Sequence, residues 1–595
     1  MGRPMYGGKA LAAAGVMMLA AVPAIATSTS AAATGIRPAA VAGTAEERLS
    51  RVCAAQKDLR DPRADDAVRA DALLSGTVRI TDFPPQPLPE DIDWAHSPMS
   101  TTNFQAQFQA LNWTDPLRRE YLRTGDVRYL ERYEQILRDF VEDNPDHTQP
   151  LTPWSWYDFA EGRRGTILGC AVLELGEQDW LMRALAEHAA SISEPSHYSG
   201  IGNHSLMQNA GLITLGVALD DDAALQLVCA RASDLLPRAV STDGVSLEGS
   251  IHYHGLNHMW WREFGQVLDA AGLEQMELQE RVALMGAFGE AATFPDGSSV
   301  NFGDGFPGAK SRYQPGGPPL SIFRPGYLFS RSSSNVGPAM LAVHYGQPFD
   351  GMPHGHMDAG SIELFAAGKR LITDSGPYAY GGGFWRNWSK GASAHNVVSS
   401  PGTEYLKSSI SKLVDYKRDA YWLTATWSIP VMSKVTWYRT IKQSLRHGWI
   451  VVMDQVNAPT SRPWVSRWNL PDDVAYRVKP YRIDQASGAG GRISIVQVAG
   501  TPTVSLAQGK KTPYLSTTAG WRSYSYETIE PAPTAELAKT AKSWRLVTLI
   551  APRAAGELAD TVKVTGVRTT STTVTFTVTT ARGATTLTMK RLTSS

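Results

Sequence analysis

The sequence is poor in cysteine, in net charge and in long apolar runs. Its three cysteines, Cys53, Cys170 and Cys229, stand far apart and form no Cys-x-x-Cys pair, which argues against a cysteine metal knuckle or a dithiol redox site. The count permits one disulfide and one thiol, but Cys170 and Cys229 lie in apolar helical runs where a buried free cysteine is commoner. We therefore expect no disulfide framework.

Net charge is absent as well, because 57 Lys and Arg balance 57 Asp and Glu. No overall field then attracts a polyanion, and an acidic ligand must be held by cations and hydrogen-bond donors placed locally. This balance makes nucleic acid an unexpected partner.

The apolar run Ala10–Ala26 follows Arg3 and Lys9 and ends in the small residues Ala24-Ile25-Ala26. It is shorter than the roughly 20 residues of a membrane-spanning helix, and no twin-arginine pair precedes it. These features predict a secretory signal peptide over residues 1–33. We expect a secreted, extracellular protein that uses the general secretory route and has no membrane contact after cleavage.

What the sequence does contain is a change of periodicity. From residue 45 to about 305 apolar residues recur at intervals of three and four, which predicts a succession of amphipathic helices. Residues 306–325 are rich in Gly and Pro and form the predicted linker. Residues 326–595 contain many short alternating, β-branched runs without helical periods between them, which favours an antiparallel β-sandwich.

Histidine is concentrated in a few short segments: Asn203-His204-Ser205, the run from Asp243 to His254, His354-Gly355-His356-Met357-Asp358, and Ala394-His395-Asn396 after Thr373–Gly376. Taken singly, most of these residues fit ordinary roles: a helix cap for Asn203, a packed core residue for Tyr253, loop and cap positions for Asp243 and Glu248.

The set His354, His356, Asp374 and His395 is more specific, because zinc accepts imidazole nitrogen and carboxylate oxygen. A His-x-His pair on a strand points its rings to opposite faces. We therefore expect one of the two rings to bind metal while the other faces a cleft.

Together these ordered motifs resemble the heparinase II/III-like polysaccharide lyases, which include alginate, oligoalginate, heparin and heparan lyases. The resemblance implies an incomplete (α/α) toroid over residues 45–305, a β-sandwich over residues 326–595, and an active site between them. It implies Asn203, His204, Tyr253 and His354 for the chemistry. It also implies one zinc ion, held by His356, Asp374 and His395. A structural role is the preferred one, and a Lewis-acid role on the uronate stays open.

The activity implied is β-elimination on an acidic, uronic-acid-containing polysaccharide. The proton next to the uronate carboxylate is weakly acidic, so Asn203 with His204 or His354 is expected to neutralise that carboxylate. Tyr253 or His204 serves as the base, and Tyr253 is the preferred donor to the leaving oxygen. The sequence leaves open the polysaccharide, endo or exo cleavage and the oligomeric state.

Two alternatives stay open at this point. A glycoside hydrolase on a similar toroid needs two carboxylic acids, for which Asp243 and Glu248 are the nearest candidates. A non-catalytic polysaccharide-binding protein would use tryptophans as stacking platforms. The candidates for that role are Trp154, Trp156, Trp260, Trp261, Trp385 and Trp388.

Overall fold

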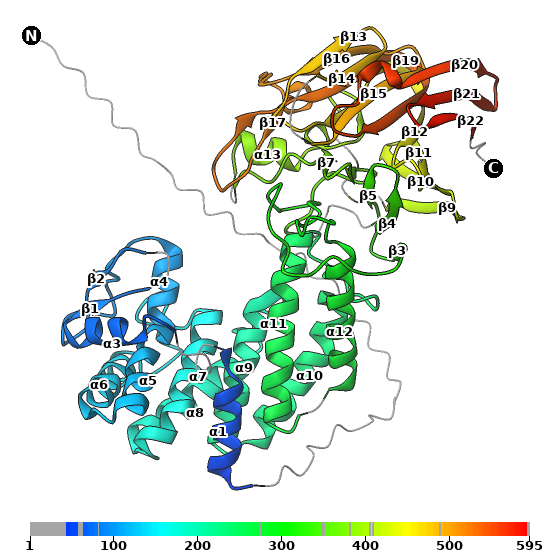
Figure 1. The fold of residues 1–595 in the computed structure, drawn as a ribbon. Coiled ribbons are helices and arrows are strands. Elements are labelled where there is room, and N and C mark those ends of the chain that lie inside the picture. The colour runs from blue at the N-terminus through cyan, green and yellow to red at the C-terminus, as the bar shows by residue number, and fades with distance from the viewer. Residues whose placement is uncertain are drawn as a thin grey trace, which may run out of the picture. The chain divides into compact units, whose positions relative to one another are not determined.

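The computed structural model describes residues 43–57, 63–80, 83–273, 275–346, 352–379, 382–403, 406, 408, 410–486 and 490–591 (Figure 1). The predicted signal peptide lies outside these residues and stays a prediction. None of the helices described has the length and apolar character needed to cross a membrane.

The first part of the described chain is helical, apart from the small pair β1 (Thr77–Val78) and β2 (Gln86–Pro87). Amphipathic spacing explains these helices: one face of α6 buries Tyr129, Tyr133, Ile136 and Phe140. The helices are α1 (Ala45–Ala55), α3 (Asp66–Leu74), α4 (Thr102–Gln109), α5 (Asp115–Thr124), α6 (Val127–Asp143), α7 (Asp158–Leu175), α8 (Asp179–Ser193), α9 (Gly202–Ala218), α10 (Asp222–Ala239), α11 (Ile251–Ala270) and α12 (Met276–Ala291).

Helices α7 and α9 approach each other unusually closely, and glycine makes this possible. A Cβ atom on Gly211 would lie 2.2 Å from the carbonyl oxygen of Gly162, and a Cβ atom on Gly162 would lie 2.6 Å from the carbonyl oxygen of Met207. Any larger residue at either position would push the helices apart. This contact fixes α9, which carries Asn203 and His204 at its start, against α7.

A disulfide joins Cys53 of α1 to Cys170 of α7, while Cys229 is free and buried. The expectation that Cys170 is a buried free thiol is therefore wrong. Cys170 is buried, as its apolar helical run predicts, but it is buried against α1. The Cα atoms of Cys53 and Cys170 lie 5.8 Å apart, a separation that a disulfide bond spans.

The second part of the described chain is built from antiparallel sheets (Figure 1). A five-stranded sheet runs β3 (Leu320–Phe323), β4 (Tyr327–Ser334), β5 (Gly337–His344), β6 (Ile362–Ala366), β7 (Lys369–Ile372). Eight strands of a ten-stranded sheet follow one another in the order β13 (Tyr476–Lys479), β14 (Arg482–Gln485), β15 (Arg492–Ala499), β19 (Thr534–Arg553), β12 (Ile450–Asn469), β11 (Val435–Ser444), β10 (Trp422–Met432) and β9 (Lys412–Arg418). The other two strands pair outside this order: β16 (Thr503–Ala507) pairs with β19, and β8 (Val398–Ser399) pairs with β12. A three-stranded sheet comprises β20 (Lys563–Thr569), β21 (Thr573–Thr580) and β22 (Gly583–Lys590), and a short pair comprises β17 (Trp521–Arg522) and β18 (Glu530–Pro531).

Strand β12 shows how these sheets stack. Ile450 and Val452 pack in one core with residues of the five-stranded sheet, while Val451 and Met453 pack in another core with the three-stranded sheet. This follows from the two-residue period of a strand. The other face of the five-stranded sheet packs against Phe288 and Ala291 of α12.

The prediction of an incomplete (α/α) toroid followed by an antiparallel β-sandwich is confirmed. Helix α12 ends at Ala291 and β3 begins at Leu320. The domain limits placed at residues 305 and 325 stay predictions.

Candidate active site

His204 and Asn203 lie in the first turn of α9. His204 Nδ1 bonds the carboxylate of Asp158 at 3.0 Å, and its ring packs on Phe159 with 5.0 Å between centroids. Asn203 lines a cavity of about 130 Å³ that Trp260 of α11 also lines. Trp260 follows Tyr253 by seven residues, so both lie on one face of α11, roughly 10 Å apart along its axis.

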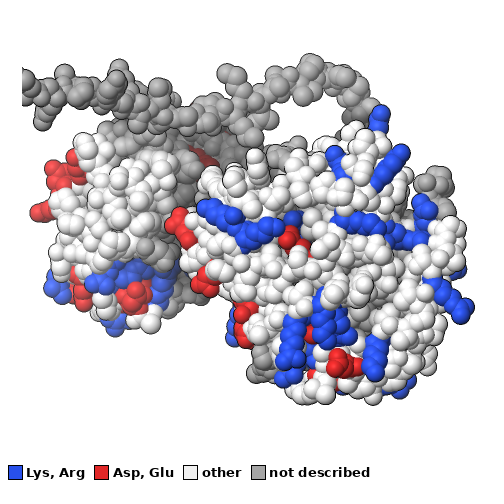
Figure 2. Space-filling model, turned by 90° about the horizontal axis from the view of Figure 1, so that it is seen from above, with Lys and Arg blue, Asp and Glu red and all other residues white. Residues whose placement is uncertain are grey.

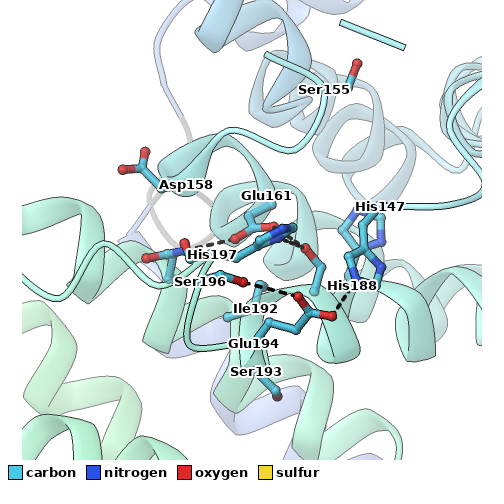
Figure 3. Close-up of polar contacts among 12 residues, drawn as sticks. His147, Ser155, Asp158, Glu161, His188, Ile192, Ser193, Glu194, Ser196 and His197 are labelled. Atoms are coloured by element: carbon cyan, nitrogen blue, oxygen red, sulfur yellow. Dashed lines mark hydrogen bonds and ion pairs between the residues drawn. The ribbon is translucent and has the colours of Figure 1, made fainter. Parts of the chain in front are cut away.

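Glu161 of α7 holds the segment that leads into α9. Its carboxylate accepts hydrogen bonds from Gln208 Nε2 at 2.9 Å and from Ser191 Oγ at 2.6 Å, and it lies 4.0 Å from His197 Nδ1 (Figure 3). Gln208 Oε1 in turn accepts the backbone N–H of Ser199. Burial raises the pKa of Glu161 to about 7, although these hydrogen bonds oppose the rise.

Because of Glu161, we expect the free energy of unfolding to decrease as the pH rises from about 4.5 to about 7. A carboxyl whose pKa is raised on folding binds its proton more tightly in the folded chain, so its contribution is complete at low pH and is lost as the pH rises to the folded value. The shift corresponds to about 3 kcal/mol. Urea unfolding of the wild type and Glu161→Gln should therefore show a stability difference that shifts in favour of the variant as the pH rises from 5 to 8. Glu131→Gln, at an exposed position of α6, is the control and should leave the pH dependence unchanged; a pH-independent difference for Glu161→Gln would contradict the prediction.

Tyr253 and His354 come from different parts of the chain and stack face to face. Their ring centroids lie 3.3 Å apart with an interplanar angle of 9°. The side chain of His354 is 18 % exposed, so the pair is partly open to solvent. His354 Nε2 lies 3.9 Å from Glu248, whose carboxylate accepts a hydrogen bond from Asn257 at 2.9 Å and has a pKa raised by burial.

Asp304 is the buried centre of this site. Its carboxylate is bonded by His354 Nδ1 at 3.0 Å, by His356 Nε2 at 2.8 Å and by both terminal nitrogens of Arg386, at 2.5 and 2.8 Å, from α13 (Phe384–Lys390). Burial alone would raise the pKa of Asp304, but these hydrogen bonds hold it well below its usual range. Asp304 is therefore ionised throughout the physiological pH range.

The backbone around Asp304 is tied to the start of α11. Ser250 caps this helix by accepting the N–H of Tyr253, and its hydroxyl donates to the carbonyl of Asp304 at 2.5 Å. Gly303 has φ of +71°, and a Cβ atom there would lie 2.1 Å from the carbonyl oxygen of Gly249. Only glycine allows the two segments to lie this close.

An ionised carboxylate only accepts hydrogen bonds, so Asp304 fixes the tautomers of both histidines that contact it. His354 carries a proton on Nδ1, which leaves the lone pair on Nε2 when the ring is neutral. His356 carries its proton on Nε2, which leaves the lone pair on Nδ1.

His356, Asp374 and His395 are buried, and each offers a ligand atom within 4.8 Å of the others. His395 Nδ1 bonds Asp374 at 2.8 Å. Among the described residues, no hydrogen bond of good geometry reaches the remaining ring nitrogens, His356 Nδ1 and His395 Nε2, which are both buried. Two partnerless lone pairs, each on a ring whose other nitrogen is held by a carboxylate, suit a metal ion.

A second group, Asp146, His147 and Glu187, also brings its ligand atoms together. This group differs in the hydrogen bonds of its histidine ring. Both ring nitrogens of His147 already bond carboxylates. Nδ1 bonds Glu187 at 2.5 Å, and Nε2 bonds Glu194 at 3.0 Å (Figure 3). His147 therefore has no lone pair to give to a metal, and we assign this group a structural role.

One detail of the predicted metal site is wrong. The segment from His354 to His356 is a loop between β5 and β6, not a strand, and both rings bond the same carboxylate, that of Asp304. The turns at residues 353–360 replace the alternation of a strand. The two rings nevertheless differ in exposure, because His356 is fully buried and His354 is not.

Asp304 and Arg386, which are 82 residues apart, were not among the site residues expected from the sequence. Asp304 was assigned to the end of the helical domain, and no local motif marks Arg386. Asp243 and Glu248, the pair considered for hydrolysis, have separate partners: Asp243 binds the backbone N–H and the guanidinium of Arg324, while Glu248 binds Asn257.

Two family models match the chain in sequence. The heparinase II/III N-terminus model matches residues 54–314, and the heparinase II/III-like C-terminal model matches residues 326–582. Two curated heparin-sulfate lyases are also similar. The lyase from Bacteroides stercoris is 22% identical over 52% of this chain and 56% of its own length. The lyase from Bacteroides thetaiotaomicron is 25% identical over 27% of this chain and 25% of its own length. The aligned regions thus span about half and a quarter of these relatives.

Solved structures share the fold. A heparan sulfate lyase from Pedobacter heparinus superimposes with a TM-score of 0.73 at 15% identity and covers 92% of this chain and 94% of its own. A chondroitin AC lyase from Streptomyces coelicolor, solved with chondroitin sulphate, superimposes with a TM-score of 0.52 at 11% identity. The match covers 90% of this chain and 92% of the lyase. Because the two family models together match most of the chain, it belongs to the heparinase II/III-like family of polysaccharide lyases, as its motifs predicted.

Proposed function

We propose that this chain is a secreted lyase that cleaves a uronic-acid-containing polysaccharide by β-elimination. The observation that carries the proposal is the stacked pair Tyr253 and His354, with His354 oriented by the ionised Asp304. The names of the relatives support an acidic polysaccharide, since they act on heparin, heparan or chondroitin sulphate.

In this mechanism His354 and Tyr253 divide the proton transfers, so the proposed base is His354 and not Tyr253 or His204, the bases expected from the sequence. His354 Nε2 takes the proton from the carbon next to the uronate carboxylate, and Asp304 stabilises the resulting imidazolium. The electron pair forms a carbon-carbon double bond as the bond to the glycosidic oxygen breaks. Tyr253 donates its phenolic proton to the leaving oxygen.

Asn203 neutralises the uronate carboxylate by donating from its side-chain amide. A well-placed donor of this kind contributes roughly 3 kcal/mol to the stability of an enolate-like transition state. Asn203 lines the same cavity as Trp260, which lies on the face of α11 that carries Tyr253. His204, bonded to Asp158, orients the start of α9 and is the second candidate for this neutralisation.

We also propose zinc as the metal of the site formed by His356, Asp374 and His395. Imidazole and carboxylate ligands are those that zinc accepts, and both partnerless nitrogens, His356 Nδ1 and His395 Nε2, are buried. The bound ion would tie the loop that carries His354 to the end of β7. Its role is structural, because His356 shares Asp304 with His354 and thereby holds the base in place.

A panel of uronate polysaccharides tests the proposal: alginates, heparan-type chains, hyaluronan and bacterial exopolysaccharides. We expect at least one to yield a product with the ultraviolet absorbance of an unsaturated uronate, without added cofactor. Neutral polysaccharides of similar length serve as controls. A panel without any absorbing product, under conditions where the protein is folded, would contradict β-elimination.

A further inference from the structure

The equal numbers of charges in the whole chain hide a division between its two halves. Residues 326–595 contain 31 Lys and Arg but only 16 Asp and Glu, a formal charge of +15, and residues 1–325 carry the opposite charge. Lys and Arg predominate on the face of the β-rich part seen in Figure 2. A polyanion is therefore attracted to the β-rich half of the chain.

Within this half, four side chains form an aromatic platform, defined by Phe384, Trp385, Trp521 and Lys511. The rings of Trp385 and Trp521 lie 4.9 Å apart between centroids, and those of Phe384 and Trp385 lie 5.2 Å apart at 87°. The ammonium group of Lys511 lies 5.1 Å from the centroid of Phe384 and 5.0 Å from that of Trp385. All three rings are half-buried, and Lys511 is exposed.

Lys511 makes no ion pair with any acid that the structure describes, and its ammonium group lies over the two rings. Its neighbour Lys510 differs, because it pairs with Glu536 at 3.5 Å. A half-buried tryptophan offers a face on which a sugar ring stacks, and a lysine without an acid beside it offers a charge to a carboxylate or a sulfate. The platform thus combines the two contacts that an acidic sugar needs.

Helix α13 connects this platform to the active site. Trp385 precedes Arg386, which binds Asp304 with both terminal nitrogens, and Lys390 at the end of the same helix donates from Nζ to the carbonyl of Pro353, next to His354. The seven residues of α13 span roughly 10 Å. A polysaccharide of several sugar units at His354 is long enough to reach the platform.

We propose that the aromatic platform is an accessory subsite that binds an acidic sugar unit of the substrate at a distance from the bond that is cleaved. This inference rests on the proposed function for the identity of the ligand. It predicts that the platform improves the binding of long acidic chains and contributes nothing to the chemical step on short ones.

The test measures the binding of long heparan sulfate chains to the full-length protein, with Tyr253→Phe as background to prevent turnover. Adding Lys511→Gln should weaken binding about threefold to fivefold at low salt, and the difference should shrink at high salt. Lys479→Gln, at an exposed lysine of β13 in the same basic half, is the matched control and should change binding by less than about twofold. Trp385→Ala should weaken binding at both salt concentrations.

Equal losses of binding in Lys511→Gln and Lys479→Gln would overturn the inference and indicate attraction by the overall positive charge of this half. Unchanged binding in Lys511→Gln would also overturn it. Its failure and that of the proposed function are distinguishable. An unsaturated product together with binding that Lys511→Gln leaves unchanged would overturn only the subsite. Binding that depends on Lys511, without an unsaturated product from any uronate polysaccharide, would support the subsite and overturn only the lyase mechanism.

Discussion

Tyr253→Phe should lower kcat by at least about a hundredfold while changing KM little, as expected when a positioned proton donor is lost. The substitution removes only the hydroxyl group, so the ring should keep its stack on His354 and the protein its fold. Initial rates of product absorbance on the best substrate, together with a thermal melt of each variant, measure the effect.

Tyr313 provides a matched control for this variant. It stacks on His258 at 5.6 Å and 9° and bonds the Nδ1 atom of that ring at 2.8 Å, so Tyr313→Phe also removes the hydroxyl of a tyrosine stacked on a histidine. We expect Tyr313→Phe to keep kcat within about threefold of the wild type. Near-wild-type turnover of Tyr253→Phe, or an equal loss in both variants, would contradict the role of Tyr253.

His395→Ala should remove the zinc and destabilise the protein by about 3 kcal/mol or more. Asp374 would be left buried without its histidine partner, and breaking a buried pair of this kind is costly. For a chain of 595 residues that unfolds as one unit, the loss corresponds to at least roughly 2 °C in Tm. Activity should fall indirectly, because the loop that carries His354 loses its anchor. Metal analysis of protein purified without chelator should give about one zinc per chain in the wild type.

His344→Ala separates the loss of a buried pair from the loss of the metal. His344 bonds Asp358 at 2.8 Å in an equally buried setting, but it is not one of the three ligands. This variant should lower Tm and retain zinc. Zinc-free wild-type protein with full stability and activity would refute the metal site. If zinc removal abolished activity at an unchanged Tm, the metal would act on the substrate and the structural role would be wrong.

The fold could be predicted because its two periodicities are local properties of the sequence. The spacing of Tyr129, Tyr133, Ile136 and Phe140 indicates a helix with one buried face, and neighbouring residues of β12 alternate between two cores. The disulfide could not be predicted in this way. An apolar run shows that Cys170 is buried but not which helix it is buried against.

The site was predicted only where a motif marks it. His356, Asp374 and His395 followed from the resemblance to known lyases, and the structure brings these three side chains together. Asp304 carries no such mark, although it bonds both His354 and His356, because its partners lie 50 to 82 residues away along the chain. Only the folded chain shows that one carboxylate orients both the proposed base and a proposed metal ligand.

The mass of the product formed in ¹⁸O-labelled water decides whether the bond breaks by β-elimination. We expect an oligosaccharide with a double bond at its new non-reducing end, lighter by one water than a hydrolysis product and free of the label at the cleaved bond. A product that carries one ¹⁸O atom and lacks the double bond would contradict elimination and show that the chain hydrolyses its substrate.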